Sequence, residues 1–190
     1  DLVASFDVTR AGKASDLLIY EAINTADGAF IGDVFDRDLR ISEALRPRMT
    51  SVSEEVARRL AIEGYYGPVC LDAFVWNDGK EDRLRALVEV NARRQVAAGA
   101  LRLWQLWDRR PVVYWRLFSS KKLRLPGEYS EFPAVLGDDA FVPIRRRGVL
   151  LTSPLDLVGG KPMRIGVLLA GEDRSAVDTL DRRFRDRFER

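Results

Sequence analysis

The chain has 190 residues, 46% of them hydrophobic, and its 31 basic residues nearly balance its 29 acidic residues. This length and composition predict a packed core in one sizeable domain or one and a half, and the small net charge gives no argument for nucleic acid as a partner. The chain has no histidine and one cysteine, Cys70, which excludes Ser-His-Asp triads, histidine-ligated or multi-cysteine zinc sites and an internal disulfide.

The sequence also lacks the signals of membrane insertion and export. It contains no run of about 18 apolar residues and no visible signal peptide. We therefore expect no membrane partner and a reducing, cytoplasmic setting. Because the chain begins with Asp1 and its first residues already have the pattern of a strand, we expect it to be a fragment that begins inside a fold.

The N-terminal part has the pattern of an antiparallel meander of strands separated by turns. The expected strands cover residues 1–10, 15–22 and 30–35. Arg10, Lys13 and Arg37 could approach phosphates, although exposed cations at turns are the more common outcome.

A helix follows, which we expect to begin after Ser51 and to end before Gly64. Ser51 as the N-cap and Glu54 three residues later have the pattern of a capping box. The expected apolar stripe of this helix consists of Val52, Val56, Leu60 and Ile62. A helix with this stripe would pack beneath the strands that come next and hold them rigid.

A β-hairpin is expected over residues 66–91, where two apolar segments flank a polar turn that contains Gly79. If the turn leaves residue 78 opposite residue 83, Asp72 of the first strand lies opposite Glu89 of the second. A shift by one pair would place Asp72 opposite Asn91 instead.

In both registers Asp72, Glu89 and Asn91 share one face of the hairpin, because side chains two residues apart in a strand point the same way. Their oxygen atoms are ligands that Mg²⁺ or Mn²⁺ prefers. Two carboxylates directly opposite each other are destabilising unless a cation neutralises them. The sequence therefore predicts a metal site, with solvent-facing acids as the plainer alternative. Phe74 and Trp76 share this face and either line a cleft or belong to the core.

The composition becomes helical from Gln95 to Trp107. Arg93 and Arg94 lie at the junction of strand and helix, and arginine binds phosphate or carboxylate groups with two hydrogen bonds. We expect Arg93 to contact a phosphate or acyl-phosphate oxygen as a catalytic residue, and Arg94 to point outward.

Residues 110–190 are expected to form a small α+β appendage without chemistry of its own. The expected elements are strands at 111–124, 148–152 and 163–169, a loop at 125–137, and a C-terminal amphipathic helix at 172–190 with Val177, Leu180, Phe184 and Phe188 in its apolar stripe. Gly159-Gly160-Lys161-Pro162 is expected to be a plain turn, because it lacks the spacing of a phosphate-binding loop.

Two segments together resemble the C-terminal half of the ATP-grasp superfamily. These are Gly64-Tyr65-Tyr66-Gly67-Pro68 with Asp72, and Glu89-Val90-Asn91-Ala92-Arg93-Arg94-Gln95-Val96. In that family a Gly-Tyr turn leads to a strand with an acidic metal ligand, and the partner strand ends in Glu-x-Asn-x-Arg, often followed by x-Gln. The resemblance covers residues 50–105 well and residues 1–50 in general pattern, and Ala92 stands where many members have proline.

The resemblance implies an ATP- and Mg²⁺-dependent ligase that forms C–N bonds. Such an enzyme activates a small-molecule carboxylate as an acyl phosphate, which an amine or a thiol then attacks. Asp72, Glu89 and Asn91 would bind the metal and, through it, the nucleotide, and Arg93 would stabilise the transferring phosphoryl group. Two alternatives stay open: a non-catalytic nucleotide- or metal-binding module, and a structural interaction domain. The chain could also form a homo-oligomer.

The fold class implied is α+β, with an antiparallel sheet and packed helices. Residues 1–109 would be the C-terminal lobe of an ATP-grasp fold, and residues 110–190 the appendage. The other lobe of the family brings lysines and a flexible glycine-rich loop, which are not identifiable in this sequence. We therefore expect the chain by itself not to turn over ATP.

Overall fold

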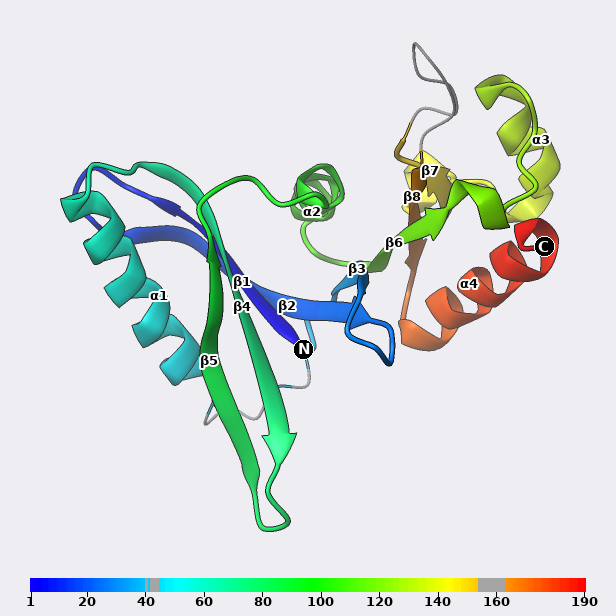
Figure 1. Ribbon diagram of the computed structural model, residues 1–190. Helices are drawn as coiled ribbons and strands as arrows, with labels where there is room; N and C mark the ends of the chain where they lie inside the picture. Colours follow the sequence, from blue (N-terminus) through cyan, green and yellow to red (C-terminus); the bar gives the residue numbers. More distant parts are fainter. Residues whose placement is uncertain (40, 42–44, 154–162) are drawn as a thin grey trace. The chain divides into compact units, whose positions relative to one another are not determined.

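The computed structural model describes residues 1–39, 41, 45–153 and 163–190. They form an α+β fold with an eight-stranded antiparallel open sheet and four α-helices (Figure 1). The expected fold class is thereby confirmed, while its assignment to the ATP-grasp fold stays a prediction. None of the helices in this described part is both long and apolar enough to cross a membrane.

The chain packs into two compact units. The first consists of Asp1–Ala22 and Asp38–Ala98, and the second of Ile23–Arg37 and Gly99–Arg190. The first holds the strands in the order β5-β4-β1-β2 and the second holds β3-β6-β8-β7. The sequence predicts a boundary at residue 109 between an ATP-grasp lobe and an appendage. That boundary depends on membership of the family, so it stays a prediction.

The first unit contains one helix and the hairpin expected from the sequence. Its elements are β1 (Leu2–Val8), β2 (Ala14–Asn24, of which the last residues belong to the second unit), α1 (Leu45–Ile62), β4 (Gly67–Asn77) and β5 (Asp82–Asn91). The predicted N-terminal strands and the hairpin are therefore confirmed.

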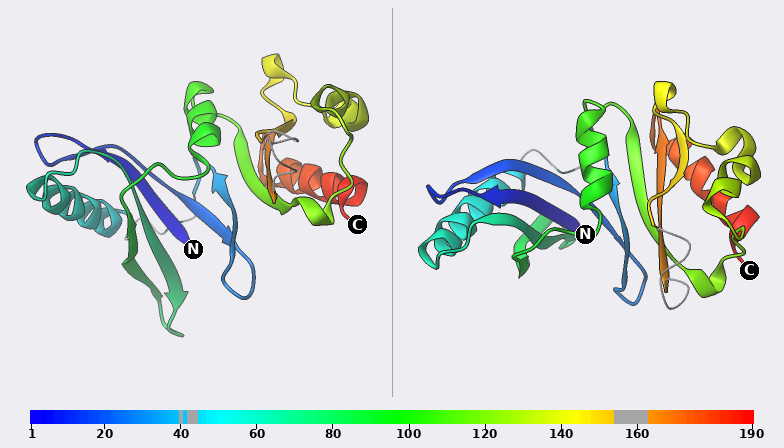
Figure 2. Two further views of the ribbon diagram at one scale, coloured as in Figure 1. Left: turned by 45° about the horizontal axis from the view of Figure 1, so that its top comes forward. Right: turned by 90° about the horizontal axis from the view of Figure 1, so that it is seen from above.

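The sheet of the first unit has two unlike faces, because alternate side chains of a strand point to opposite sides. One face is apolar. Helix α1 lies on one side of this sheet, as the views in Figure 2 show, and packs against the apolar face. The strand residues of this core are Leu2, Ala4, Phe6, Val8, Val69, Leu71, Ala73, Leu84 and Ala86. The other face carries Cys70, Asp72, Phe74 and Trp76 of β4, and the candidate site lies there.

Helix α1 begins at Leu45, so the predicted N-cap at Ser51 is wrong. Pro47 lies in the first turn, where a proline loses no hydrogen bond and its φ already suits a helix. Ser51 is an exposed residue of the helix interior. Glu54 does not cap α1 either, because its carboxylate accepts a hydrogen bond from the backbone N–H of Ala14 at 3.1 Å.

The buried side of α1 includes most of the expected stripe. Its buried residues are Met49, Ser53, Val56 and Ala57. Val56 belongs to the core and Val52 and Leu60 pack against it, as expected, but Ile62 is 70% exposed and the prediction that it faces the core is wrong. The hydroxyl of Ser53 donates to the carbonyl oxygen of Met49 at 2.9 Å, which lets a polar side chain lie in this core.

Helix α1 ends as the sequence predicts. Gly64 has φ +83°, its N–H donates to the carbonyl oxygen of Ala61 at 3.0 Å, and the N–H of Tyr65 donates to that of Leu60 at 2.9 Å. These bonds form a Schellman motif, which pairs carbonyl groups that the last turn would otherwise leave free. The motif turns the chain into β4, the strand that carries Asp72.

The second unit holds the remaining elements. These are β3 (Phe30–Phe35), α2 (Ala98–Leu106, which begins one residue earlier in the first unit), β6 (Val112–Ser119), α3 (Phe132–Leu136), β7 (Gly148–Leu151), β8 (Arg164–Gly171) and α4 (Arg174–Phe188). Its core includes the four apolar residues predicted for the C-terminal helix, each no more than 5% exposed.

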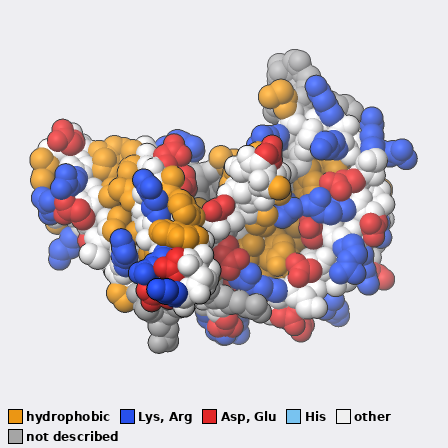
Figure 3. All heavy atoms as spheres, turned by 60° about the horizontal axis from the view of Figure 1, so that its bottom comes forward, with side chains coloured by type: hydrophobic (Ala, Val, Ile, Leu, Met, Phe, Trp, Pro, Cys, Tyr) orange, Lys and Arg blue, Asp and Glu red, His pale blue; other side chains and the backbone are white. Residues whose placement is uncertain are grey.

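Two expectations for this unit need correction. Residues 125–137 are not only loop, because they contain the short helix α3, which begins at Phe132 with Pro133 in its first turn and buries Phe132 and Leu136. Helix α2 begins at Ala98 rather than at Gln95. The predicted turn at Gly159–Pro162 lies outside the described residues. On the face drawn in Figure 3, acidic and basic side chains are interspersed, in keeping with the net charge of +2.

Candidate functional site

The hairpin turn is one residue away from its expected position. Asn77 lies opposite Asp82, so the predicted opposition of residues 78 and 83 is wrong. The side chain of Asp78 accepts hydrogen bonds from the backbone N–H groups of Lys80 and Glu81, and Gly79 supplies a φ of +90°. These local bonds favour a short turn, as acids and glycine commonly do.

A bulge in β5 then changes the register of the hairpin. Phe74 lies opposite Arg85, but Asp72 lies opposite Glu89, so three residues of β5 (86–88) oppose Ala73 alone. Such bulges bend a strand and re-aim its side chains. The predicted opposition of Asp72 and Glu89 is therefore confirmed, although the sequence did not predict the bulge that produces it.

The four predicted site residues lie together on this face of the first unit. The side-chain amide of Asn91 donates to Asp72 Oδ2 at 3.1 Å. The guanidinium group of Arg93 reaches Asn91 Oδ1 at 3.4 Å, a long contact. Glu89 lies directly opposite Asp72 on the neighbouring strand. Asp72 and Asn91 are half-buried, whereas Glu89 and Arg93 are exposed, so the site opens to solvent on the side of the charged groups.

The surroundings raise the pKa of Asp72 above its usual value. Burial is the largest cause, followed by the negative charge of Glu89 and the hydrogen bond between the two carboxyl groups. The hydrogen bond from Asn91 and the positive charge of Arg93 act in the opposite direction. Burial and a neighbouring negative charge destabilise the charged form of a carboxyl group, and a bound proton or a nearby cation relieves this destabilisation.

The donor set fits a hard divalent cation. It offers two carboxylates and one carboxamide oxygen, and Mg²⁺ binds through few protein oxygens while keeping water or phosphate ligands. The described residues contain no group of three or more His, Cys, Asp and Glu side chains that could hold a metal.

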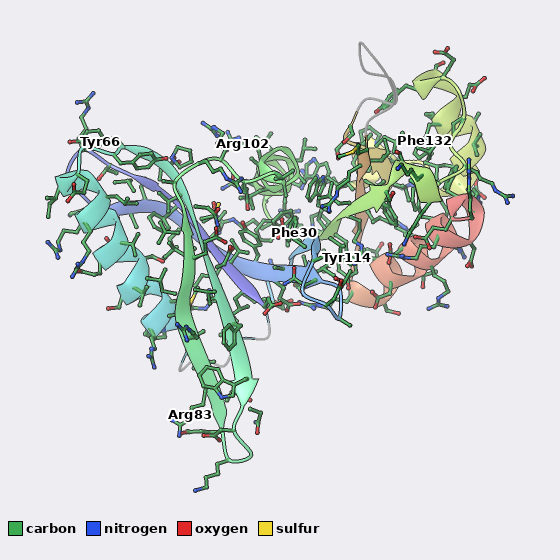
Figure 4. The ribbon with its side chains drawn as sticks, in the orientation of Figure 1. Phe30, Tyr66, Arg83, Arg102, Tyr114 and Phe132 are labelled. Carbon is green, nitrogen blue, oxygen red and sulfur yellow. The ribbon has the colours of Figure 1, made fainter. Side chains whose placement is uncertain are left out.

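Phe74 and Trp76 extend the same face toward the hairpin tip. Their ring centroids are 5.5 Å apart, and Trp76 is 44% exposed, so Trp76 is not a core residue. Their cross-strand partners are Arg85 and Arg83, and Figure 4 shows Arg83 near the tip. This end of the hairpin thus combines aromatic and cationic side chains.

Sequence reasoning missed a polar cluster beneath the site. The buried Tyr20 donates its hydroxyl hydrogen to Gln95 Oε1, and Cys70 Sγ lies 3.9 Å from the same oxygen. Gln95 continues the alternating series of residues 89, 91 and 93, and this spacing is the signal that could have pointed to it. No sequence signal marks Tyr20, which is distant in the chain.

Two cations that could have approached phosphates, Arg10 and Lys13, are not brought to this site. Arg10 lies 5.5 Å from the ring centroid of Tyr66, beyond the end of β1 that pairs with Gly67, whereas Val3 pairs with Asp72. Lys13 lies in the same turn, where its N–H donates to the hydroxyl of Thr9 at 3.1 Å. Arg37 belongs to the second unit.

Comparison with models of known protein families and with curated proteins gave no match to this chain.

Proposed function

We propose that the protein to which this chain belongs is an ATP- and Mg²⁺-dependent ligase of the ATP-grasp type. It would activate a carboxylate as an acyl phosphate, which an amine or a thiol then attacks. The observation that supports this proposal is the opposition of Asp72 and Glu89 on the hairpin, with Asn91 bonded to Asp72 and Arg93 beside Asn91.

The carboxylates would supply the metal-binding part of the site. Asp72 and Glu89 together present two negative charges, and burial together with the charge of Glu89 raises the pKa of Asp72, so a bound cation would favour its charged form. Asn91 would add an uncharged oxygen and orient Asp72 through its amide. Bound Mg²⁺ neutralises charge on phosphate groups during phosphoryl transfer.

Arg93 would act on the phosphate itself. Arg93 is exposed, and within the described residues the hydrogen bonds of its guanidinium group are two long contacts of 3.4 Å, to Asn91 Oδ1 and to the carbonyl oxygen of Arg94. The guanidinium group can therefore turn toward a phosphate group and bind it through two N–H groups, and it would give up only weak hydrogen bonds in doing so. Phosphoryl transfer relies on positioning and electrostatics, so the lack of histidine is no obstacle.

The test is thermal melting of the longest natural polypeptide that contains this sequence, with ATP, in the presence and absence of Mg²⁺. A ligand that binds only the folded state raises the melting temperature by mass action. We expect a Mg²⁺-dependent shift in the wild type that is lost in Glu89→Gln. Glu63→Gln, the same change at an exposed position at the end of α1, should keep the shift. No shift in the wild type, or an unchanged shift in Glu89→Gln, would contradict the proposal.

A second candidate is a non-catalytic metal- or nucleotide-binding module. It is favoured by the grouping of two carboxylates, Asn91 and Arg93, which could hold a cation and a phosphate group without transferring the phosphate. This candidate also predicts the Mg²⁺-dependent shift, but no hydrolysis or transfer of the γ-phosphate by the same polypeptide with any carboxylate and amine.

A further inference from the structure

Arg93 lies in the segment 92–97, which joins β5 to α2. Most of this segment is exposed, but Gln95 is half-buried and Ala97 is 1% exposed. The placement of Arg93 therefore depends on how its neighbours are attached to the sheet, because Arg93 is exposed and its side chain makes two long contacts to other described residues.

Gln95 attaches the segment through one atom. Its Oε1 accepts the hydroxyl hydrogen of Tyr20 and lies 3.9 Å from Cys70 Sγ. Its Nε2 is buried and makes no hydrogen bond within the described residues. The anchoring contacts of this side chain thus converge on its carbonyl oxygen.

Tyr20 belongs to the same part of the sheet as the acids of the site. Val3 pairs with Tyr20 on one side and with Asp72 on the other. Asp72 in turn pairs with Glu89, so one row of residues crosses β2, β1, β4 and β5. Tyr20 is 0% exposed, which leaves its ring little freedom and makes its hydroxyl a fixed point.

We propose that Tyr20 is a positioning residue: through Gln95 it fixes the segment 92–97, and with it the place of Arg93 relative to Asp72 and Asn91. Loss of the hydroxyl would leave Gln95 Oε1 without this donor in a place of low water access, which favours opening of the segment. The anchoring follows from the contacts alone, and the consequence for phosphate binding rests on the proposed function.

Hydrogen exchange of backbone amides tests the anchoring without any ligand. In Tyr20→Phe, residues 92–98 should exchange several-fold faster than in the wild type. Tyr65→Phe is the matched control, because its hydroxyl also makes one bond in this unit, to the carbonyl oxygen of Pro68 at 2.6 Å. It should leave residues 92–98 unchanged. Equal exchange of these residues in the wild type and in Tyr20→Phe would overturn the proposal.

Gln95→Met removes the same hydrogen bond from the exposed segment and leaves the core of the sheet intact. It therefore serves where Tyr20→Phe does not fold, and it should speed exchange of residues 92–98 in the same way. The double variant should exchange no faster than Gln95→Met alone, because that change already removes the contact that Tyr20→Phe removes. Additive effects would show that Tyr20 and Gln95 act separately.

Nucleotide affinity in the longest natural polypeptide tests the consequence for Arg93. With Mg²⁺ present, Tyr20→Phe should weaken ATP binding about tenfold, since a misplaced group forfeits much of its contribution. ADP binding should change less, because Arg93 is assigned to the transferred phosphate. If the ratio of ATP to ADP affinity stays at its wild-type value while exchange of residues 92–98 rises, Tyr20 does not position Arg93. Failure of the wild type to bind ATP would instead contradict the proposed function and leave the anchoring standing.

Discussion

Asp72 lies opposite Glu89, although the register set by the hairpin turn would place Leu87 there. The bulge at residues 86–88 replaces an apolar neighbour of Asp72 with a second acid. Like charges at opposed positions destabilise a sheet. The arrangement therefore weakens the hairpin locally, unless a positive charge is supplied.

Replacement of Asp72 should change how the free energy of unfolding depends on pH. Because its pKa is raised in the folded state, the folded chain binds the proton more tightly than the unfolded chain does. The free energy of unfolding should then fall as the pH rises from the ordinary value near 3.8 through the raised value. Without divalent cations, Asp72→Asn should lack this fall and be the more stable protein at pH 7.

Chemical denaturation of both proteins from pH 3 to pH 8 would measure this difference. Asp16→Asn is the control, since Asp16 is an exposed acid of the same unit, and its φ of +54° is one that asparagine tolerates. Its pH profile should follow that of the wild type. Identical profiles for Asp72→Asn and the wild type would show that Asp72 titrates normally.

The corrected start of α1 predicts that replacing Ser51 and replacing Asp173, the N-cap of α4, change the stability of the protein in different directions. Ser51→Ala should be neutral or stabilise the protein by up to about 0.5 kcal/mol, because alanine is the better residue inside a helix. Asp173→Ala should cost about 1 kcal/mol, because Asp173 caps α4 by accepting from the N–H of Ala176 at 2.8 Å. Urea denaturation measures both. A loss of 1 kcal/mol or so for Ser51→Ala would restore the N-cap assignment.

Two glycines should respond differently to the same substitution. Gly64→Ala should destabilise the protein by about 1 kcal/mol, because Gly64 has φ +83° in the Schellman motif. A new Cβ there would meet nothing within 4 Å, so the penalty comes from the backbone alone. Gly99→Ala, in helix α2, should instead be neutral or slightly stabilising. Thermal melting of the two variants compares them, and equal effects would contradict the backbone argument.

The core of the second unit should depend strongly on Phe184. Its ring centroid is 4.9 Å from those of Phe118 and Phe188, and the residue is 1% exposed. Phe184→Ala should therefore cost about 3–5 kcal/mol. Val135→Ala is a control in the same unit, where the side chain is 45% exposed, and it should change stability by less than about 0.5 kcal/mol. A small effect of Phe184→Ala in guanidinium denaturation would show that this cluster is loosely packed.

Local pattern was sufficient to predict most strands, the C-terminal helix and the grouping of Asp72, Glu89 and Asn91. Alternation and helical spacing record which face is buried, and these elements bury one face each. The start of α1 was missed because Ser51 and Glu54 have capping-box spacing but lie inside the helix. The bulge was missed because Leu87 and Val88 have ordinary strand propensity. The contact of Tyr20 with Gln95 joins distant parts of the chain, and no local signal specifies it.

The bulge also bears on the solubility of the chain. β5 is the first strand in the order of the sheet, with β4 as its neighbour in the described part of the chain, and Leu87, Val88 and Val90 are exposed on it. An outer strand with apolar side chains can pair with the same strand of another molecule and start aggregation. A bulge interrupts the row of backbone groups that such pairing needs. The irregularity that sets Glu89 against Asp72 therefore also protects this edge from self-association.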